Sequence, residues 1–196
     1  MRYLMLKKPF NLLKLAFILN CFFHAGIASA DIKFPKSCEI TPNSIAKIRL
    51  GTSLHQVKAI YPNAKLARVT DGDGVALVSV TVGNQDLAVL YAGEEDASEK
   101  INFSKKIQAI ETFNSMCKTK LSIRPKSALK KAAKLLGGIE QIRMSEIEGR
   151  QYVKFKKQSG NLIYRINYCG DFANDSMRET NKYLPDCVIL SIAIAN

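Results

Sequence analysis

Two stretches of the chain share one spacing of apolar and polar positions, and they start 75 residues apart, at Ile48 and Ile123. The first reads IRLGTSLHQVKAIYP and the second reads IRPKSALKKAAKLLG. In both, apolar residues recur at the three- and four-residue intervals that form one face of a helix. Thr52 and Ser127 stand where a residue that caps a helix belongs. Each stretch therefore predicts a short amphipathic helix.

The similarity continues beyond the helices into segments with the alternating pattern of half-buried strands. A polar turn that ends in glycine follows the first strand in each copy, at 71–74 and at 146–149. Two more alternating segments follow, then a long loop, and a last strand near 107–113 or 188–194. Each copy thus predicts a helix, a strand, a hairpin strand, a third strand, a long loop and a fourth strand.

The predicted fold is α+β, with two similar units that each pack one short helix on a four-stranded antiparallel sheet. Unit 1 spans 48–113 and unit 2 spans 123–196, with an N-terminal segment at 31–47 and a linker at 114–122. One such unit buries little apolar surface, so we expect the two units to stack or to join edge to edge.

The first thirty residues have the pattern of a signal peptide. Four basic residues and no acidic residue precede the apolar stretch LAFILNCFFHAGI, and Ala28-Ser29-Ala30 gives the small residues that signal peptidase needs. That stretch is shorter than the roughly 20 residues of a membrane-spanning helix. We predict cleavage after Ala30, no membrane span after cleavage, and a periplasmic or secreted protein.

Four cysteines follow the predicted cleavage site, and an even number in an exported chain predicts two disulfides. Of the three possible pairings we favour Cys169 with Cys187, which would fasten the base of the second long loop, and Cys38 with Cys117. The other two pairings stay open. No C-x-x-C pair occurs, and His55 is the only histidine after the cleavage site, so we predict no metal site.

Net positive charge gathers in the second half of the chain. The whole chain has a formal charge of +12. After the predicted cleavage, residues 31–117 hold ten basic and ten acidic residues, whereas 118–196 hold fifteen and seven. This asymmetry favours contact with an acidic protein or an anionic envelope polymer. A surface that only maintains solubility is the alternative.

Candidate contact residues lie in two parts of unit 2. Alternation places one group on a common face of two neighbouring strands, and the opposite face is apolar: Tyr152, Lys154, Lys156, Arg165 and Asn167. The long loop adds residue types that are enriched at binding hot spots: Phe172, Arg178 and Tyr183. The alternatives are a solvated sheet face and aromatic side chains that fold inward to anchor the loop.

Enzymatic motifs do not occur in this chain. There is no G-x-S-x-G, phosphate-binding loop or dinucleotide fingerprint, and nucleophilic catalysis with a histidine would have to use His55. The acidic pairs Asp71/Asp73 and Glu146/Glu148 recur at equivalent turns, and hairpin chemistry explains them without a bound cation. We therefore predict no catalytic residue and no cofactor.

The segment Gly51-Thr52-Ser53-Leu54-x-x-Val57 resembles the G-[MT]-[ST]-x-x-x-V helix opening of the SmpA-like envelope domains. Two helix-plus-sheet units in an exported chain with two disulfides are also similar to the β-lactamase inhibitor protein architecture. The resemblance covers roughly 48–113 and 123–194 in layout. It implies a protein-binding module without enzymatic activity, and it transfers no inhibitory residue to this chain.

The leading hypothesis is an exported, non-enzymatic protein-binding module, as an inhibitor, an immunity-type antidote or an envelope accessory. Its basic second unit would contact an acidic macromolecular partner. One alternative is an envelope component that binds anionic lipid or polysaccharide. Another is an unrecognised enzyme that uses His55. Positive charge also suits nucleic acid, but the export signal argues against nucleic acid as a partner.

Overall fold

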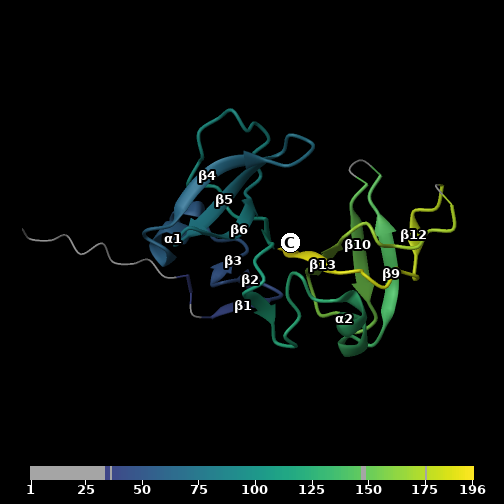
Figure 1. Cartoon of the computed structure of the whole chain (residues 1–196). Helices are drawn as coiled ribbons and strands as arrows, with labels where there is room; N and C mark the ends of the chain where they lie inside the picture. Colours follow the sequence, from purple (N-terminus) through teal and green to yellow (C-terminus); the bar gives the residue numbers. More distant parts are fainter. Residues whose placement is uncertain (1–33, 36, 147–148, 175) are drawn as a thin grey trace, which may run out of the picture. The chain divides into compact units, whose positions relative to one another are not determined.

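The computed structural model describes residues 34–35, 37–146, 149–174 and 176–196. The predicted signal peptide and the cleavage site after Ala30 lie outside the described residues. The described chain is α+β, with two short helices and mainly antiparallel strands (Figure 1). Within these ranges, no helix has the length and apolar composition that a membrane crossing requires.

Both halves of the chain begin with a helix and continue into strands of one large sheet. The first half contains α1 (Leu54–Ile60), β4 (Lys65–Thr70), β5 (Ala76–Val82), β6 (Gln85–Tyr91) and β7 (Ala109–Thr112). The second half contains α2 (Leu129–Leu135), β9 (Ile139–Met144), β10 (Gln151–Phe155), β11 (Leu162–Ile166), β12 (Glu179–Thr180) and β13 (Ile189–Ala195).

These strands form a single nine-stranded sheet in the order β12-β9-β10-β11-β13-β7-β6-β5-β4, with all neighbours antiparallel. The two halves meet where β13 pairs with β7, with Ile194 opposite Ile110. Of the two arrangements considered from the sequence, this is the edge-to-edge one. The hydrogen bonds do not separate a four-stranded sheet for each unit, because the ladder continues across the junction.

The helices begin one residue later than the predicted caps. Ser53 occupies the N-cap position of α1 and Ala128 that of α2, rather than Thr52 and Ser127, and Ala128 makes no side-chain capping hydrogen bond. The Thr52 hydroxyl instead donates to the carbonyl of Arg49 at 2.7 Å. The Ser127 hydroxyl accepts a backbone N–H from the preceding turn. Both side chains therefore stabilise the turn before the helix.

One face of the large sheet carries the core. Alternate residues of β5, β10 and β11 are buried on this face, as the period of two requires. The edge of the Phe155 ring packs against Tyr164 with the centroids 5.2 Å apart, and burial raises the pKa of Tyr164 to about 12. Leu129 of α2 and Leu54 of α1 belong to the same apolar cluster. Both helices therefore cover one side of the sheet.

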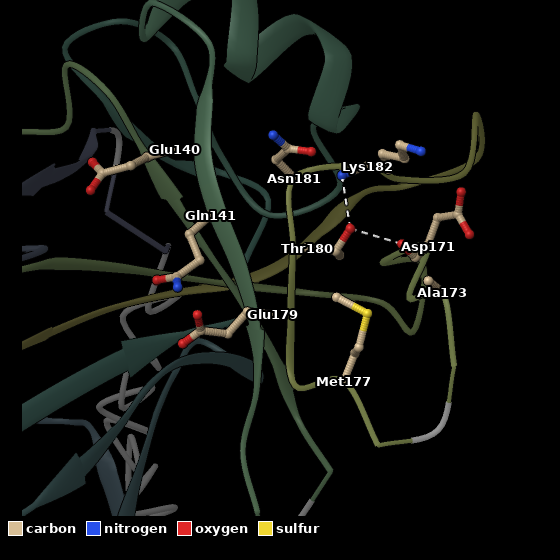
Figure 2. A pocket seen from close by; sticks show the side chains of 9 residues that line it. All are labelled: Glu140, Gln141, Asp171, Ala173, Met177, Glu179, Thr180, Asn181 and Lys182. Carbon is tan, nitrogen blue, oxygen red and sulfur yellow. Dashed lines mark hydrogen bonds between the residues drawn. The ribbon is translucent and has the colours of Figure 1, made fainter.

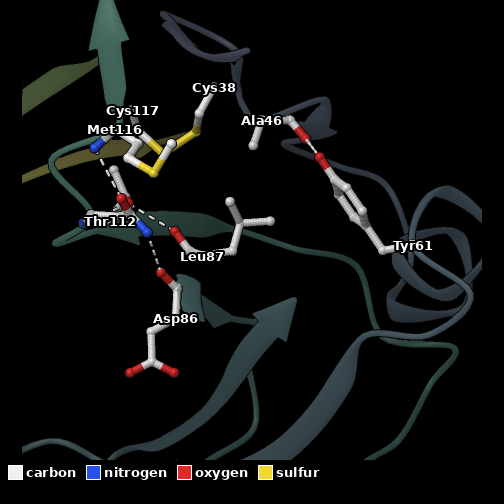
Figure 3. The surroundings of a disulfide bond; sticks show 9 residues. Cys38, Ala46, Tyr61, Asp86, Leu87, Thr112, Met116 and Cys117 are labelled. Carbon is white, nitrogen blue, oxygen red and sulfur yellow. Dashed lines mark hydrogen bonds between the residues drawn. A yellow bond between two sulfur atoms is a disulfide. The ribbon is translucent and has the colours of Figure 1, made fainter. Parts of the chain in front are cut away.

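A second, four-stranded sheet was not predicted. Its strands come from the N-terminal segment, the first residues of predicted unit 1 and the linker, in the order β3-β2-β1-β8: β1 (Cys38–Thr41), β2 (Ser44–Ile45), β3 (Ile48–Arg49) and β8 (Cys117–Thr119). β1 and β8 pair in parallel, which puts Cys38 directly opposite Cys117. A disulfide joins these two residues (Figure 3). The bond therefore ties the start of the described chain to the segment between its two halves.

The second disulfide joins Cys169 to Cys187. Both pairs are those favoured from the cysteine positions. All four cysteines are buried. This second bond closes the long loop between β11 and β13, and the isolated bridge between Gly170 and Tyr183 lies just inside it.

The acidic loop between β6 and β7 is held by a buried ion pair. The Arg68 guanidinium on β4 contacts the Glu94 carboxylate at 2.8 Å, and both side chains are largely buried. Glu94 also accepts the backbone N–H of Asn102 at 3.1 Å. The hydrogen bond from Arg68 lowers the pKa of Glu94 below its ordinary value of 4.5, against the opposing effect of burial. The charged pair therefore links the loop to the edge strand of the sheet.

Removing the Cys38–Cys117 bond is expected to cost more stability than removing Cys169–Cys187, because it closes the longer segment. The sequence separations are 79 and 18 residues. The chain-entropy model gives about 4.5 and about 3 kcal/mol. Urea unfolding of the two double Cys→Ala variants measures both losses. A larger loss for the Cys169/Cys187 variant would contradict this account.

The Arg68→Met variant is expected to lose about 1–3 kcal/mol of unfolding free energy at neutral pH, because it leaves the Glu94 carboxylate buried without its cation. The pKa of Glu94 is lowered in the folded state, so its contribution is complete above the ordinary pKa and is lost as the pH falls through the lowered one. Urea unfolding at about pH 7 and about pH 3 should therefore show a smaller difference between wild type and variant at the lower pH. A pH-independent difference would mean that the pair contributes packing only.

Candidate functional site

The side of the nine-stranded sheet that faces away from both helices is called the open face. Cross-strand pairing places a continuous set of side chains on it: Arg143, Tyr152, Lys154, Arg165, Ala193, Glu111, Val89, Leu77 and Val69. None of these residues belongs to the buried core. The open face therefore crosses the junction between the two halves without interruption.

The basic end of the open face contains most of the strand residues predicted from the sequence. Tyr152 pairs with Arg165 on one side and with Arg143 on the other. Lys154 lies on the same side of β10, and its ammonium contacts the Glu140 carboxylate at 2.6 Å. Both partners are well exposed, so this ion pair contributes little to stability. The structure thus brings one aromatic and three cationic side chains together.

Lys156 and Asn167 each lie one residue beyond the strand on which they were predicted. The backbone N–H of Lys156 donates to the carbonyl of Gly138 at 3.0 Å, next to the end of α2. The Asn167 side-chain oxygen accepts the backbone N–H of Val188 at 2.8 Å. The backbone N–H of Asn167 donates back to the Val188 carbonyl at 3.2 Å. Asn167 therefore connects the end of β11 to the start of β13.

The aromatic residues of the fastened loop point partly inward. Phe172 and Tyr183 are half-buried against the core. The Phe172 ring lies over Gly170 so closely that a Cβ there would be 2.7 Å from a ring carbon. This is the anchoring role that was the alternative to contact with a partner. Arg178 is exposed, and its guanidinium lies 3.7 Å from the sulfur of Met144.

The other end of the open face is apolar and was not identified from the sequence. It forms a groove of about 300 Å³ whose apolar walls come from β4, β5, β6, β7 and β13. Phe113 projects there with 48% of its surface exposed. Glu111 lies among these residues and accepts a hydrogen bond from the Ser191 hydroxyl. Alternation along β5 and β6 could have revealed this patch, because Leu77 and Val89 fall opposite the buried positions.

A polar groove of about 550 Å³ lies between β9, β12 and the fastened loop (Figure 2). Its lining includes the carboxylates of Glu140, Asp171 and Glu179 and the ammonium of Lys182. The Thr180 hydroxyl donates to the Asp171 carbonyl at 2.8 Å, and this hydrogen bond lies along one side of the groove. Among the residues that the structure describes, no group of three or more acidic, histidine or cysteine side chains is arranged to hold a metal ion.

The remaining candidates from the sequence have local structural roles. His55 is exposed on α1, with its ring 5.5 Å from that of Phe103. The Asp71 carboxylate accepts the backbone N–H groups of Asp73 and Val75 at 3.0 and 2.9 Å. That contact is turn chemistry, as predicted for this acidic pair. Its counterpart at 146–149 includes Glu148, which lies outside the described residues.

Comparison with known proteins gives a likeness in fold. No protein-family model matches the chain, and no curated protein matches it. The structure is similar to that of the uncharacterized protein yfeY from Escherichia coli, with a TM-score of 0.51 and 12% sequence identity. The match covers 82% of this chain and 99% of that one. At this identity the likeness shows the fold alone.

Single substitutions should separate the structural residues of this region from the exposed ones. Asn167→Ala is expected to lose about 1–2 kcal/mol of unfolding free energy, because the N–H of Val188 loses its acceptor. Lys154→Ala should change that free energy by less than about 0.5 kcal/mol, because its ion pair is exposed. Urea unfolding measures both. Equal losses of unfolding free energy in the two variants would contradict the structural role given to Asn167.

Proposed function

We propose that this chain is an exported, non-enzymatic protein-binding module whose open face contacts an acidic partner protein. The observation that carries the proposal is the composition of that face, where three cations and Tyr152 adjoin an apolar groove that includes Phe113. Protein interfaces combine an apolar centre with a polar rim, and tyrosine, phenylalanine and arginine are enriched in them. The two disulfides fit the oxidising compartment into which an exported chain folds.

We also infer that the two halves are copies of one unit, from α1 to β7 and from α2 to β13. The equal order of elements supports this, because each half has a helix, three strands, a long loop and a closing strand. The resemblance to the β-lactamase inhibitor protein architecture supports it in the same way. On this proposal the halves have diverged in surface chemistry, with the basic open face confined to the second copy.

The charges of the basic end set the direction of recognition. Arg143, Lys154 and Arg165 would attract a partner with a negative potential and would repel basic proteins such as cationic lysozymes. Complementary charge raises the association rate, and this electrostatic effect becomes weaker as the salt concentration rises. The apolar end would then supply the buried contact area that holds the complex together.

Reversing the three charges, as Arg143→Glu, Lys154→Glu and Arg165→Glu, is expected to weaken capture of the partner about 10–100-fold at low salt. The immobilised wild-type protein is incubated with membrane-free envelope extract of the source organism, and captured proteins are identified and titrated. We expect an acidic protein that the wild type captures and the triple variant loses.

The matched control is the triple variant Lys130→Glu, Lys131→Glu and Lys134→Glu, which makes the same change in net charge on α2. It should capture the partner as the wild type does. Equal capture by the open-face variant and the wild type would exclude the open face as the surface that contacts the partner. Equal loss in both variants would show that total charge, rather than the open face, determines capture.

A further inference from the structure

The segment that connects the two halves is strongly basic. Between Glu111 and Glu140 the chain contains seven lysines and arginines and no acidic residue. All seven are exposed. Three of them, Lys118, Lys120 and Arg124, line a groove of about 520 Å³ beside β1 and β8. Cations at this density create a local positive potential that is separate from the open face.

The groove is lined by one carboxylate and by one exposed apolar side chain. Glu39 of β1 lies opposite Lys118 in the parallel ladder, so the three cations exceed the acidic charge by two. Met116 also lines the groove with 51% of its surface exposed. Figure 3 shows Met116 beside the Cys38–Cys117 disulfide. The disulfide-bonded residue Cys38 therefore lines the groove together with the three cations.

A tight turn beyond β8 keeps the side chain of Leu121 exposed. The N–H of Thr119 donates to the Ile123 carbonyl at 2.9 Å, and the N–H of Ser122 donates to the Thr119 carbonyl at 2.8 Å. The N–H of Ile123 returns to the Thr119 hydroxyl at 3.2 Å. Thr119 and Ile123 are buried, whereas Leu121 at the tip is 46% exposed. The hydrogen bonds thus keep Leu121 projecting, with Lys120 beside it.

We propose that this surface, formed by Met116, Lys118, Lys120, Leu121 and Arg124, docks the protein on an anionic phospholipid bilayer. We call it the lipid-facing surface. The cations contact headgroup phosphates, and Leu121 and Met116 enter the boundary between headgroups and acyl chains. Basic residues next to projecting apolar side chains are the combination that binds anionic interfaces. An acidic protein would match the charges, but the exposed apolar tip matches the interface.

This proposal goes beyond the protein-binding role of the open face and does not depend on it. The lipid-facing surface belongs to β8, the following turn and the groove beside β1, whereas the open face belongs to the nine-stranded sheet. Either surface can therefore be changed while the other is left intact. A protein held near a bilayer would search that membrane for its partner in two dimensions.

The test uses the purified protein and sedimentation with vesicles of phosphatidylcholine alone or with about 30% phosphatidylglycerol. We expect binding to the anionic vesicles only, and its loss at about 1 M salt, where the Debye length falls to roughly 3 Å. The variant Lys118→Glu, Lys120→Glu and Arg124→Glu should lower the partition coefficient roughly 100-fold. Leu121→Asp should lower it at least ~10-fold.

The control variant Lys65→Glu, Lys100→Glu and Lys106→Glu makes the same change in net charge on exposed residues of the first half. It should bind anionic vesicles within about 3-fold of the wild type, since surface charges act over about a Debye length. Equal loss in both triple variants, unchanged binding of Leu121→Asp, or equal binding to both vesicle types would each overturn the proposal. Unchanged urea unfolding midpoints show that each variant is folded.

Discussion

The ladder between β7 and β13 is the interaction on which the rest of the structure depends. It joins the last strand of each half, so neither strand remains as an unpaired edge. Its register, with Ile110 opposite Ile194, puts the apolar faces of both halves on one side. A slip of one residue would turn one set toward solvent. Both helices therefore share one core, and the other side of the sheet stays uncovered across the junction.

That uncovered side explains why the two halves differ most in their surfaces. Core positions on the two halves meet the same requirement for apolar residues, and they are filled by Val78 and Leu90 in one half and by Val153 and Tyr164 in the other. Open-face positions are not constrained in this way. They carry Tyr152, Lys154 and arginines in the second half, whereas in the first half they carry Val69, Leu77, Val89 and Glu111. Surface chemistry could therefore change there without loss of the fold.

Local periodicity was sufficient to predict both helices and eight of the nine strands of the large sheet, because these patterns lie within a few consecutive residues. The two-residue strand β12 lies inside the segment that was predicted as a long loop. The small sheet could not be predicted, since β1 and β8 are short and pair in parallel across 79 residues. Side-chain type alone did not reveal the local roles of Asn167 and Phe172. The Asn167 side-chain oxygen accepts the backbone N–H of Val188, and the Phe172 ring covers Gly170, so each also stabilises the fold, and their contact with a partner stays a prediction.

The order of the disulfides along the chain has a consequence for biogenesis. Cys38 pairs with the next cysteine of the described chain, Cys117, and Cys169 pairs with the last, Cys187. A chain that is made and exported from its N-terminus presents the first pair before either member of the second. Oxidation in the order of emergence therefore yields the native connectivity directly.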